Sequence, residues 1–222
     1  MAVQLDGPRL PPASGNAAKQ LVILLHGYGA DGNDLIGLGR EWAHYLPDAA
    51  FISPHAPEAL PGMVFGGRQW FNLETRNERE WEEGVRRAHP ILSAFIQDEA
   101  KNASLPLSAV ALVGFSQGTM MALQTGLRLP EAPAAIVGFS GHLAGAAHLA
   151  AEIAVKPPVL LIHGSADDVI PHQAIHLARN ALAAAGVPVQ WQIRPGLGHG
   201  IDPEGLRAAG LFLRSAFGLT GQ

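Results

Sequence analysis

Short runs of apolar residues recur along the chain, and each ends at a glycine, a proline or another turn-forming residue. The run at residues 21–25 is wholly apolar, which is typical of a strand buried on both faces of a parallel sheet. Similar runs that contain β-branched or aromatic residues predict further strands at residues 49–53, 110–114, 134–139, 159–162 and 189–193.

Segments with helical periodicity alternate with these strands, at residues 34–46, 81–101, 117–129, 172–185 and 203–217. Pro90 is expected to interrupt the second of them, while Pro130 and Gly186 are typical helix stops. Asp202 followed by Pro203 is a typical helix start. Strands that alternate with helices predict an α/β fold with a mostly parallel central sheet and helices on both faces.

The length of 222 residues is sufficient for one domain with a sizeable core, so we expect a single domain over residues 1–222. Residues 1–18 are expected to be a flexible or irregular N-terminal segment. Residues 54–80 predict a long connection around Trp70 and Phe71, and connections of that length inside a compact domain are usually functional. We predict that Trp70 and Phe71 bind substrate, with a place in the core as the alternative.

The composition argues against several classes of function. The net charge of −4 and the absence of any Lys/Arg run argue against a nucleic-acid or anionic-membrane surface. The apolar runs are far shorter than the ~20 residues of a membrane span, and the start of the chain does not resemble a signal peptide, so we expect a cytoplasmic protein. The absence of cysteine excludes disulfides and cysteine nucleophiles.

The segment Gly114-Phe115-Ser116-Gln117-Gly118 matches the pattern G-x-S-x-G and lies between a predicted strand and a predicted helix. A sharp strand-to-helix turn leaves no space for side chains at the two flanking positions, so both are glycine. The same turn presents the hydroxyl of Ser116 at a helix N-terminus. Ser116 could simply cap the helix, but the flanking glycines favour a nucleophile.

Two later loops supply an acid and a base. Asp167 follows the predicted strand 159–162, and His199 lies between glycines after the last predicted strand. The order Ser116, Asp167, His199 is the order that this architecture uses, and all three follow the carboxyl ends of strands. A serine hydroxyl needs a base to take its proton and a carboxylate to orient that base. Asp168 is the alternative acid, although loop aspartates usually form solvated caps or ion pairs.

A glycine-rich turn supplies a second element of the site. The strand at residues 21–25 runs into His26-Gly27-Tyr28-Gly29, where this architecture places one of the backbone N–H groups that bind an oxyanion. We therefore predict an oxyanion hole formed by the backbone N–H groups of Tyr28 and Gln117. His26 is expected to fix the loop by hydrogen bonding.

Other histidines carry less information. His172 and His176 have the spacing of a metal-binding pair on one helical face, but no third ligand lies nearby in the sequence. We therefore predict no metal site and expect an exposed helix face there. The roles of His142 and His148 are open.

Taken together, these motifs resemble those of the phospholipase/carboxylesterase family of small α/β-hydrolases, which includes the acyl-protein thioesterases. The resemblance spans nearly the whole chain. Its motifs are Leu-His-Gly-Tyr-Gly-Ala-Asp-Gly at residues 25–32, Gln-Trp-Phe at 69–71, Gly-Phe-Ser-Gln-Gly at 114–118, the segment 163–171, and Gly-His at 198–199.

The resemblance implies an α/β-hydrolase fold, a Ser116, Asp167, His199 triad and no cofactor, and the short length is expected to leave no room for a separate cap domain. It implies a small-molecule ester or thioester substrate cleaved through an acyl-enzyme, which we expect to carry a short or medium acyl chain. Acyl-protein thioesterase and lysophospholipase are alternatives with the same triad. A non-catalytic binding module is an alternative of another class. Tyr28 and Thr119 depart from the family pattern. Tyr28 is expected to line the entrance, so acyl-chain preference does not carry over. An apolar entrance is compatible with a homodimer.

Overall fold

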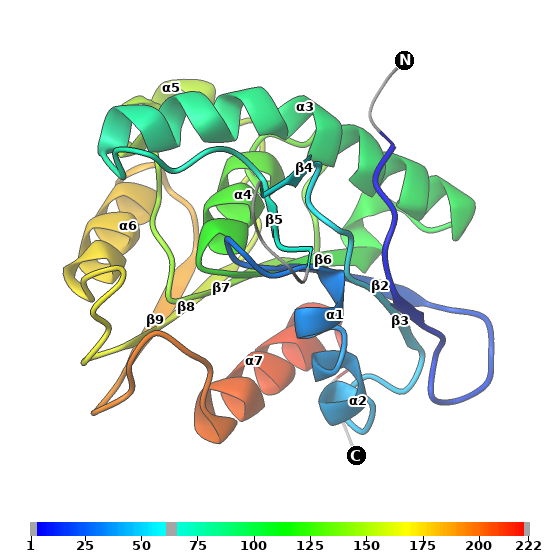
Figure 1. Ribbon diagram of the computed structural model, residues 1–222. Helices are drawn as coiled ribbons and strands as arrows, with labels where there is room; N and C mark the ends of the chain where they lie inside the picture. The colour runs from blue at the N-terminus through cyan, green and yellow to red at the C-terminus, as the bar shows by residue number, and fades with distance from the viewer. Residues whose placement is uncertain (1–3, 61–65, 220–222) are drawn as a thin grey trace.

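A seven-stranded sheet crosses the middle of the protein, with helices packed on both of its faces (Figure 1). The structure is a computed structural model that describes residues 4–60 and 66–219 of the 222. In order across the sheet, the strands are β1 (Arg9–Leu10), β3 (Ala49–Ile52), β2 (Gln20–Leu25), β6 (Val110–Phe115), β7 (Ala135–Phe139), β8 (Val159–Gly164) and β9 (Val189–Arg194). β1 pairs antiparallel with β3, while the other neighbours in this sheet are parallel. The predicted mostly parallel α/β fold is confirmed.

The parallel strands of the large sheet coincide with the predicted apolar runs to within two residues at either end. β4 (Glu58–Ala59) and β5 (Arg68–Gln69) pair in the long connection between β3 and the first long helix. β1 lies within the segment that was expected to be irregular.

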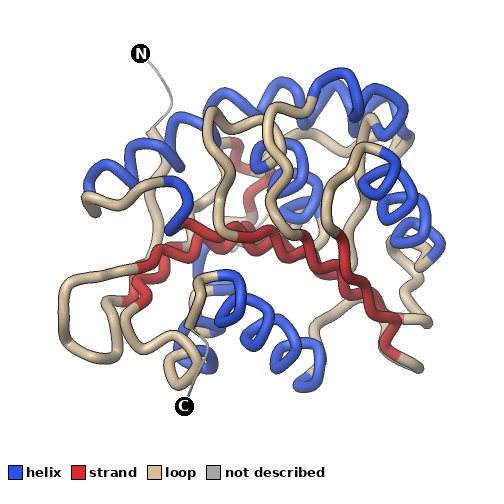
Figure 2. Tube along the Cα trace, turned by 180° about the vertical axis from the view of Figure 1, so that it is seen from behind, coloured by secondary structure: helices blue, strands red, loops and turns tan. Residues whose placement is uncertain are grey.

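Each face of the sheet carries its own hydrophobic core, because the buried strands have apolar side chains on both sides. The sheet separates two groups of helices, as the view from behind also shows (Figure 2). One face is covered by α3 (Glu78–Asn102), α4 (Gln117–Gly126), α5 (Leu149–Glu152) and α6 (Gln173–Ala184). The other face carries α1 (Gly32–Leu35), α2 (Leu38–Trp42) and α7 (Pro203–Ala216). Short 3₁₀ turns, η1 (Leu107–Ala109) and η2 (Ala146–His148), precede β6 and α5.

Two helix predictions were wrong in detail. The helix predicted at residues 34–46 is divided into α1 and α2, and the amides of Gly39 and Arg40 bond carbonyls three residues back instead of four. Pro90 was expected to interrupt the following helix, yet α3 continues through it. Pro90 is exposed, so the backbone carbonyl that lacks an N–H partner there can bind water instead.

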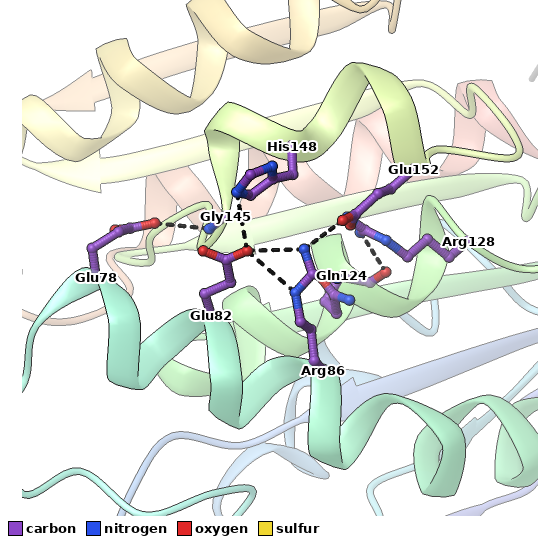
Figure 3. Close-up of polar contacts among 8 residues, drawn as sticks. All are labelled: Glu78, Glu82, Arg86, Gln124, Arg128, Gly145, His148 and Glu152. Atoms are coloured by element: carbon purple, nitrogen blue, oxygen red, sulfur yellow. Dashed lines mark hydrogen bonds and ion pairs between the residues drawn. The ribbon is translucent and has the colours of Figure 1, made fainter.

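A network of charged side chains ties α3 and α4 to the segment of η2 and α5 (Figure 3). Glu152 of α5 pairs with Arg86 of α3 and, at 2.7 Å, with Arg128 just beyond α4. Arg86 also reaches Glu82 at 2.9 Å, and Glu82 lies 3.6 Å from His148. Because one carboxylate serves two guanidinium groups, the network should contribute more than an isolated surface pair.

Replacing Glu152 by glutamine should lower the free energy of unfolding by about 1 kcal/mol, because it leaves both arginines without their shared partner. Urea denaturation followed by circular dichroism measures this change. In the matched control Glu83→Gln, which removes the exposed pair with Arg79, the loss should be below about 0.5 kcal/mol. Equal losses in the two variants would contradict the claim that the network contributes more stability than an isolated surface pair.

Candidate active site

Ser116 lies in the turn between β6 and α4. Its φ of 53° is a conformation that L residues rarely adopt, which shows how sharp the turn is. A Cβ atom at Gly118 would lie 1.8 Å from the carbonyl oxygen of Leu25, and one at Gly114 would lie 2.3 Å from the carbonyl oxygen of Gly118. Both positions therefore require glycine, as the sequence pattern predicted, and Ser116 stands at the N-terminus of α4.

Asp167 and His199 lie in the loops that follow the carboxyl ends of β8 and β9, and their side chains are in contact. His199 Nδ1 donates to Asp167 Oδ2 over 2.8 Å. The other carboxylate oxygen accepts the backbone N–H groups of Val169 and Ile170 at 3.0 and 2.9 Å. Asp168, the alternative acid, is exposed. Asp167 is thus the carboxylate that contacts His199.

The Asp167 carboxylate is fully buried yet stays ionised. Burial raises its pKa, but the hydrogen bonds from His199, Ile170 and Val169 outweigh that effect and hold the pKa below its usual value. An ionised carboxylate at this place fixes the proton of His199 on Nδ1 and leaves Nε2 free to accept one.

A second histidine contacts the same carboxylate, and sequence reasoning missed it. His163 Nε2 lies 3.1 Å from Asp167 Oδ2 and 2.9 Å from the carbonyl oxygen of Ile170. Both are acceptors, so this nitrogen carries a proton. Burial lowers the pKa of His163, which favours the neutral ring. The motif His-Gly-x-x-Asp at residues 163–167 was the available signal, since it places the two residues four apart.

Ser116 and His199 line one cavity of about 460 Å³ at this edge of the sheet. Most of its wall is apolar, with a few polar groups near Ser116, which is the usual character of a small-molecule site. Its described lining comprises Gly27, Tyr28, Leu73, Arg76, Trp81, Phe115, Ser116, Gln117, Met120, Val169, Ile170, Pro171 and His199.

The two residues predicted to supply oxyanion donors also line this cavity. Gln117 is the first residue of α4, and Tyr28 lies in the loop after β2. His26 is fully buried; its Nδ1 donates to the carbonyl oxygen of Gly27 at 2.8 Å, and its Nε2 accepts from the N–H of Ala56 at 3.0 Å. A trans peptide directs its N–H opposite to its carbonyl, so this bond directs the N–H of Tyr28 away from His26.

Trp70 and Phe71 do not form the cavity wall that was expected of them. Both are fully buried and lie outside the described lining, because two buried contacts hold them behind it. The Gln117 side chain accepts from Trp70 N at 2.9 Å and donates to the carbonyl oxygen of Phe71 at 2.7 Å. Trp70 Nε1 in turn donates to the carbonyl oxygen of His26 at 3.0 Å. The pair therefore joins the two loops of the predicted oxyanion hole.

Two further histidines pack against aromatic rings. His176 makes an edge contact with Trp191, with ring centroids 5.1 Å apart, and His142 packs against Trp81 and pairs with Glu78 at 2.6 Å. Among residues 4–60 and 66–219, no group of three or more histidines or carboxylates is arranged to hold a metal ion.

A family model described as Phospholipase/Carboxylesterase matches residues 12–217 of this chain. The chain belongs to this family. It is 31% identical to acyl-protein thioesterase 1 of Gibberella zeae, over 95% of this chain and 97% of the relative. It is also 31% identical to esterase YpfH of Escherichia coli K12, over 86% of this chain and 81% of that relative. The crystal structure of esterase PE8 superimposes with a TM-score of 0.92 at 48% identity, covering 96% of this chain and all of that one.

The family has the α/β-hydrolase fold, in agreement with the sheet observed here. In the described part of this chain, no helix is both long and apolar enough to cross a membrane.

Replacing His26 by glutamine, which keeps a side-chain acceptor but cannot titrate, should flatten the pH dependence of stability. Burial lowers the pKa of His26 to about 4. Between about pH 6.5 and pH 4 the unfolded chain therefore binds a proton that the folded protein does not, and the free energy of unfolding falls by about 3 kcal/mol across this window as the pH falls.

Urea denaturation of the wild type and His26→Gln at pH 7 and pH 4.5 tests this pH dependence. The stability difference between the two proteins should shrink at the lower pH. A difference that is the same at both pH values would show that His26 is not held neutral.

Proposed function

We propose that this protein is a serine carboxylesterase in which Ser116 is the nucleophile, His199 the general base and Asp167 the residue that orients it. The observation that carries the proposal is the 2.8 Å bond from His199 to Asp167, at the cavity that both His199 and Ser116 line. The family membership and the esterase names of the relatives support ester hydrolysis.

In the first step, His199 Nε2 takes the proton of Ser116 while Oγ attacks the ester carbonyl carbon. The tetrahedral intermediate collapses, His199 gives that proton to the leaving alcohol, and the acyl group stays on Ser116. Water then attacks the acyl-enzyme with His199 again as the base, which releases the acid and restores Ser116. Asp167 stays ionised throughout and stabilises the imidazolium.

The oxyanion is bound by the backbone N–H groups of Tyr28 and Gln117. The N–H of Gln117 is at the N-terminus of α4, where the helix dipole adds a favourable positive field. His26 sets the orientation of the Gly27–Tyr28 peptide, and the buried contacts of Trp70 keep the two donor loops at a fixed separation. Both donors are therefore preorganised, and little reorganisation is needed when charge develops.

The substrate is an ester with an apolar acyl group of short or medium length. Leu73, Trp81, Phe115 and Met120 provide the apolar wall for such a group. Thioester hydrolysis is the second candidate function, because the same triad cleaves thioesters and the relative from Gibberella zeae is named an acyl-protein thioesterase.

Ser116→Ala should lower kcat for 4-nitrophenyl esters by about 10⁴-fold or more, because no other group replaces the nucleophile. Release of nitrophenolate from the acetate, butyrate, octanoate and palmitate esters measures both the loss and the chain-length preference. The short and medium esters should be turned over fastest.

Ser93→Ala is the matched control, because Ser93 lies on α3 and is not among the described residues that line the cavity. This variant should leave kcat within a factor of about two. A Ser116→Ala protein that retains half of its activity would remove the mechanism. A wild type that prefers palmitate would overturn the assignment of chain length and leave the mechanism intact.

A further inference from the structure

Arg76 is the one permanently charged residue among those described as lining the cavity. It lies in the loop that leads into α3 and is exposed. Within the described part of the chain, its guanidinium makes no hydrogen bond or ion pair, whereas three arginines of α3, Arg79, Arg86 and Arg87, each pair with a glutamate. The cation at the cavity is therefore available to a ligand.

The backbone holds Arg76 in an unfavourable conformation. Its φ of 50° falls in the left-handed region, which costs roughly 1 kcal/mol for a residue with a Cβ atom. The Glu80 carboxylate maintains this conformation by accepting the backbone N–H groups of Glu74, Thr75 and Arg76 at 2.6, 3.0 and 2.6 Å. Glycine would fit this turn without strain, so the position carries an arginine at a cost to local stability.

The Glu80 carboxylate, although close in sequence, does not pair with the Arg76 guanidinium. Glu80 bonds the backbone of the loop and the Thr75 hydroxyl, and its contact with Arg76 is to the backbone N–H. Glu74 and Asp168 are exposed and lie outside the described lining of the cavity. An anion that enters the cavity therefore meets a fixed loop whose guanidinium has no partner among residues 4–60 and 66–219.

We propose that Arg76 binds an anionic group on the substrate, so that this site acts on esters that carry a carboxylate or phosphate remote from the reacting carbonyl. A guanidinium suits this task because its planar fork can donate two parallel hydrogen bonds to either group. The proposal rests on the proposed esterase function. It adds a substrate class that ester hydrolysis alone does not require.

The test compares matched substrates that differ in charge. The first pair is mono-4-nitrophenyl suberate, which is a carboxylate, and its methyl ester, which is neutral. The second pair is a monoacylglycerol phosphate and the corresponding monoacylglycerol, assayed by release of fatty acid. For each pair the readout is the ratio of kcat/KM for the anionic substrate to kcat/KM for the neutral one. The ratio is measured at low salt and at 0.5 M NaCl, which is roughly three times the physiological ionic strength.

Arg76→Gln should lower this ratio by about three- to tenfold in at least one pair, and Arg76→Lys by less, because lysine keeps the charge but loses the fork. Salt should lower the ratio for the wild type and have a smaller effect on Arg76→Gln. The control Arg79→Gln removes a neighbouring exposed arginine that does not line the cavity, and it should leave the ratio unchanged.

A fall in the suberate pair assigns carboxylates to the site, and a fall confined to the phosphate pair assigns phosphates. Ratios that are the same in wild type and Arg76→Gln for both pairs overturn the proposal while leaving the esterase intact. A wild type that hydrolyses none of the four substrates would instead count against the proposed function itself.

Discussion

Helix α4 begins so close to the ends of β2 and β6 that no side chain fits between them, and the geometry of the site depends on this contact. A Cβ atom at Gly118 would lie 1.8 Å from the carbonyl oxygen of Leu25. The approach forces Ser116 into its rare backbone conformation and places the N–H of Gln117 beside it at the helix N-terminus. It also brings the loop after β2 against the same turn, so one packing contact brings together the nucleophile and both predicted oxyanion donors.

Buried histidines that take no part in the proton transfer support this arrangement from two sides. His26 holds the loop after β2, and His163 lies against the carboxylate that bonds His199. Burial lowers the pKa of both rings, so each is neutral near pH 7 and uses its proton as a hydrogen-bond donor. Neutral buried donors can fix a loop or a carboxylate without adding a charge that would compete with His199.

The fold was predictable because most strands are short apolar runs bounded by turn residues and several helices have clear start or stop residues. The positions of Ser116, Asp167 and His199 followed from their places after predicted strands. Trp70 and Phe71 were harder, since the pattern cannot distinguish an aromatic that faces a cavity from one that packs behind it. The contact of His163 and the place of Arg76 in the cavity lining depend on tertiary neighbours. The course of α3 through Pro90 depends on which face the helix presents to solvent.

The central claim is that Ser116 is an activated nucleophile, and labelling with a fluorophosphonate tests it most directly. The reagent forms a bond from its phosphorus to the oxygen of a serine whose proton a base removes, and fluoride leaves. The account predicts one label per chain, on the peptide that contains Ser116, and a much slower reaction in His199→Ala. A folded wild-type protein that takes no label, or takes it at another residue, would contradict the account.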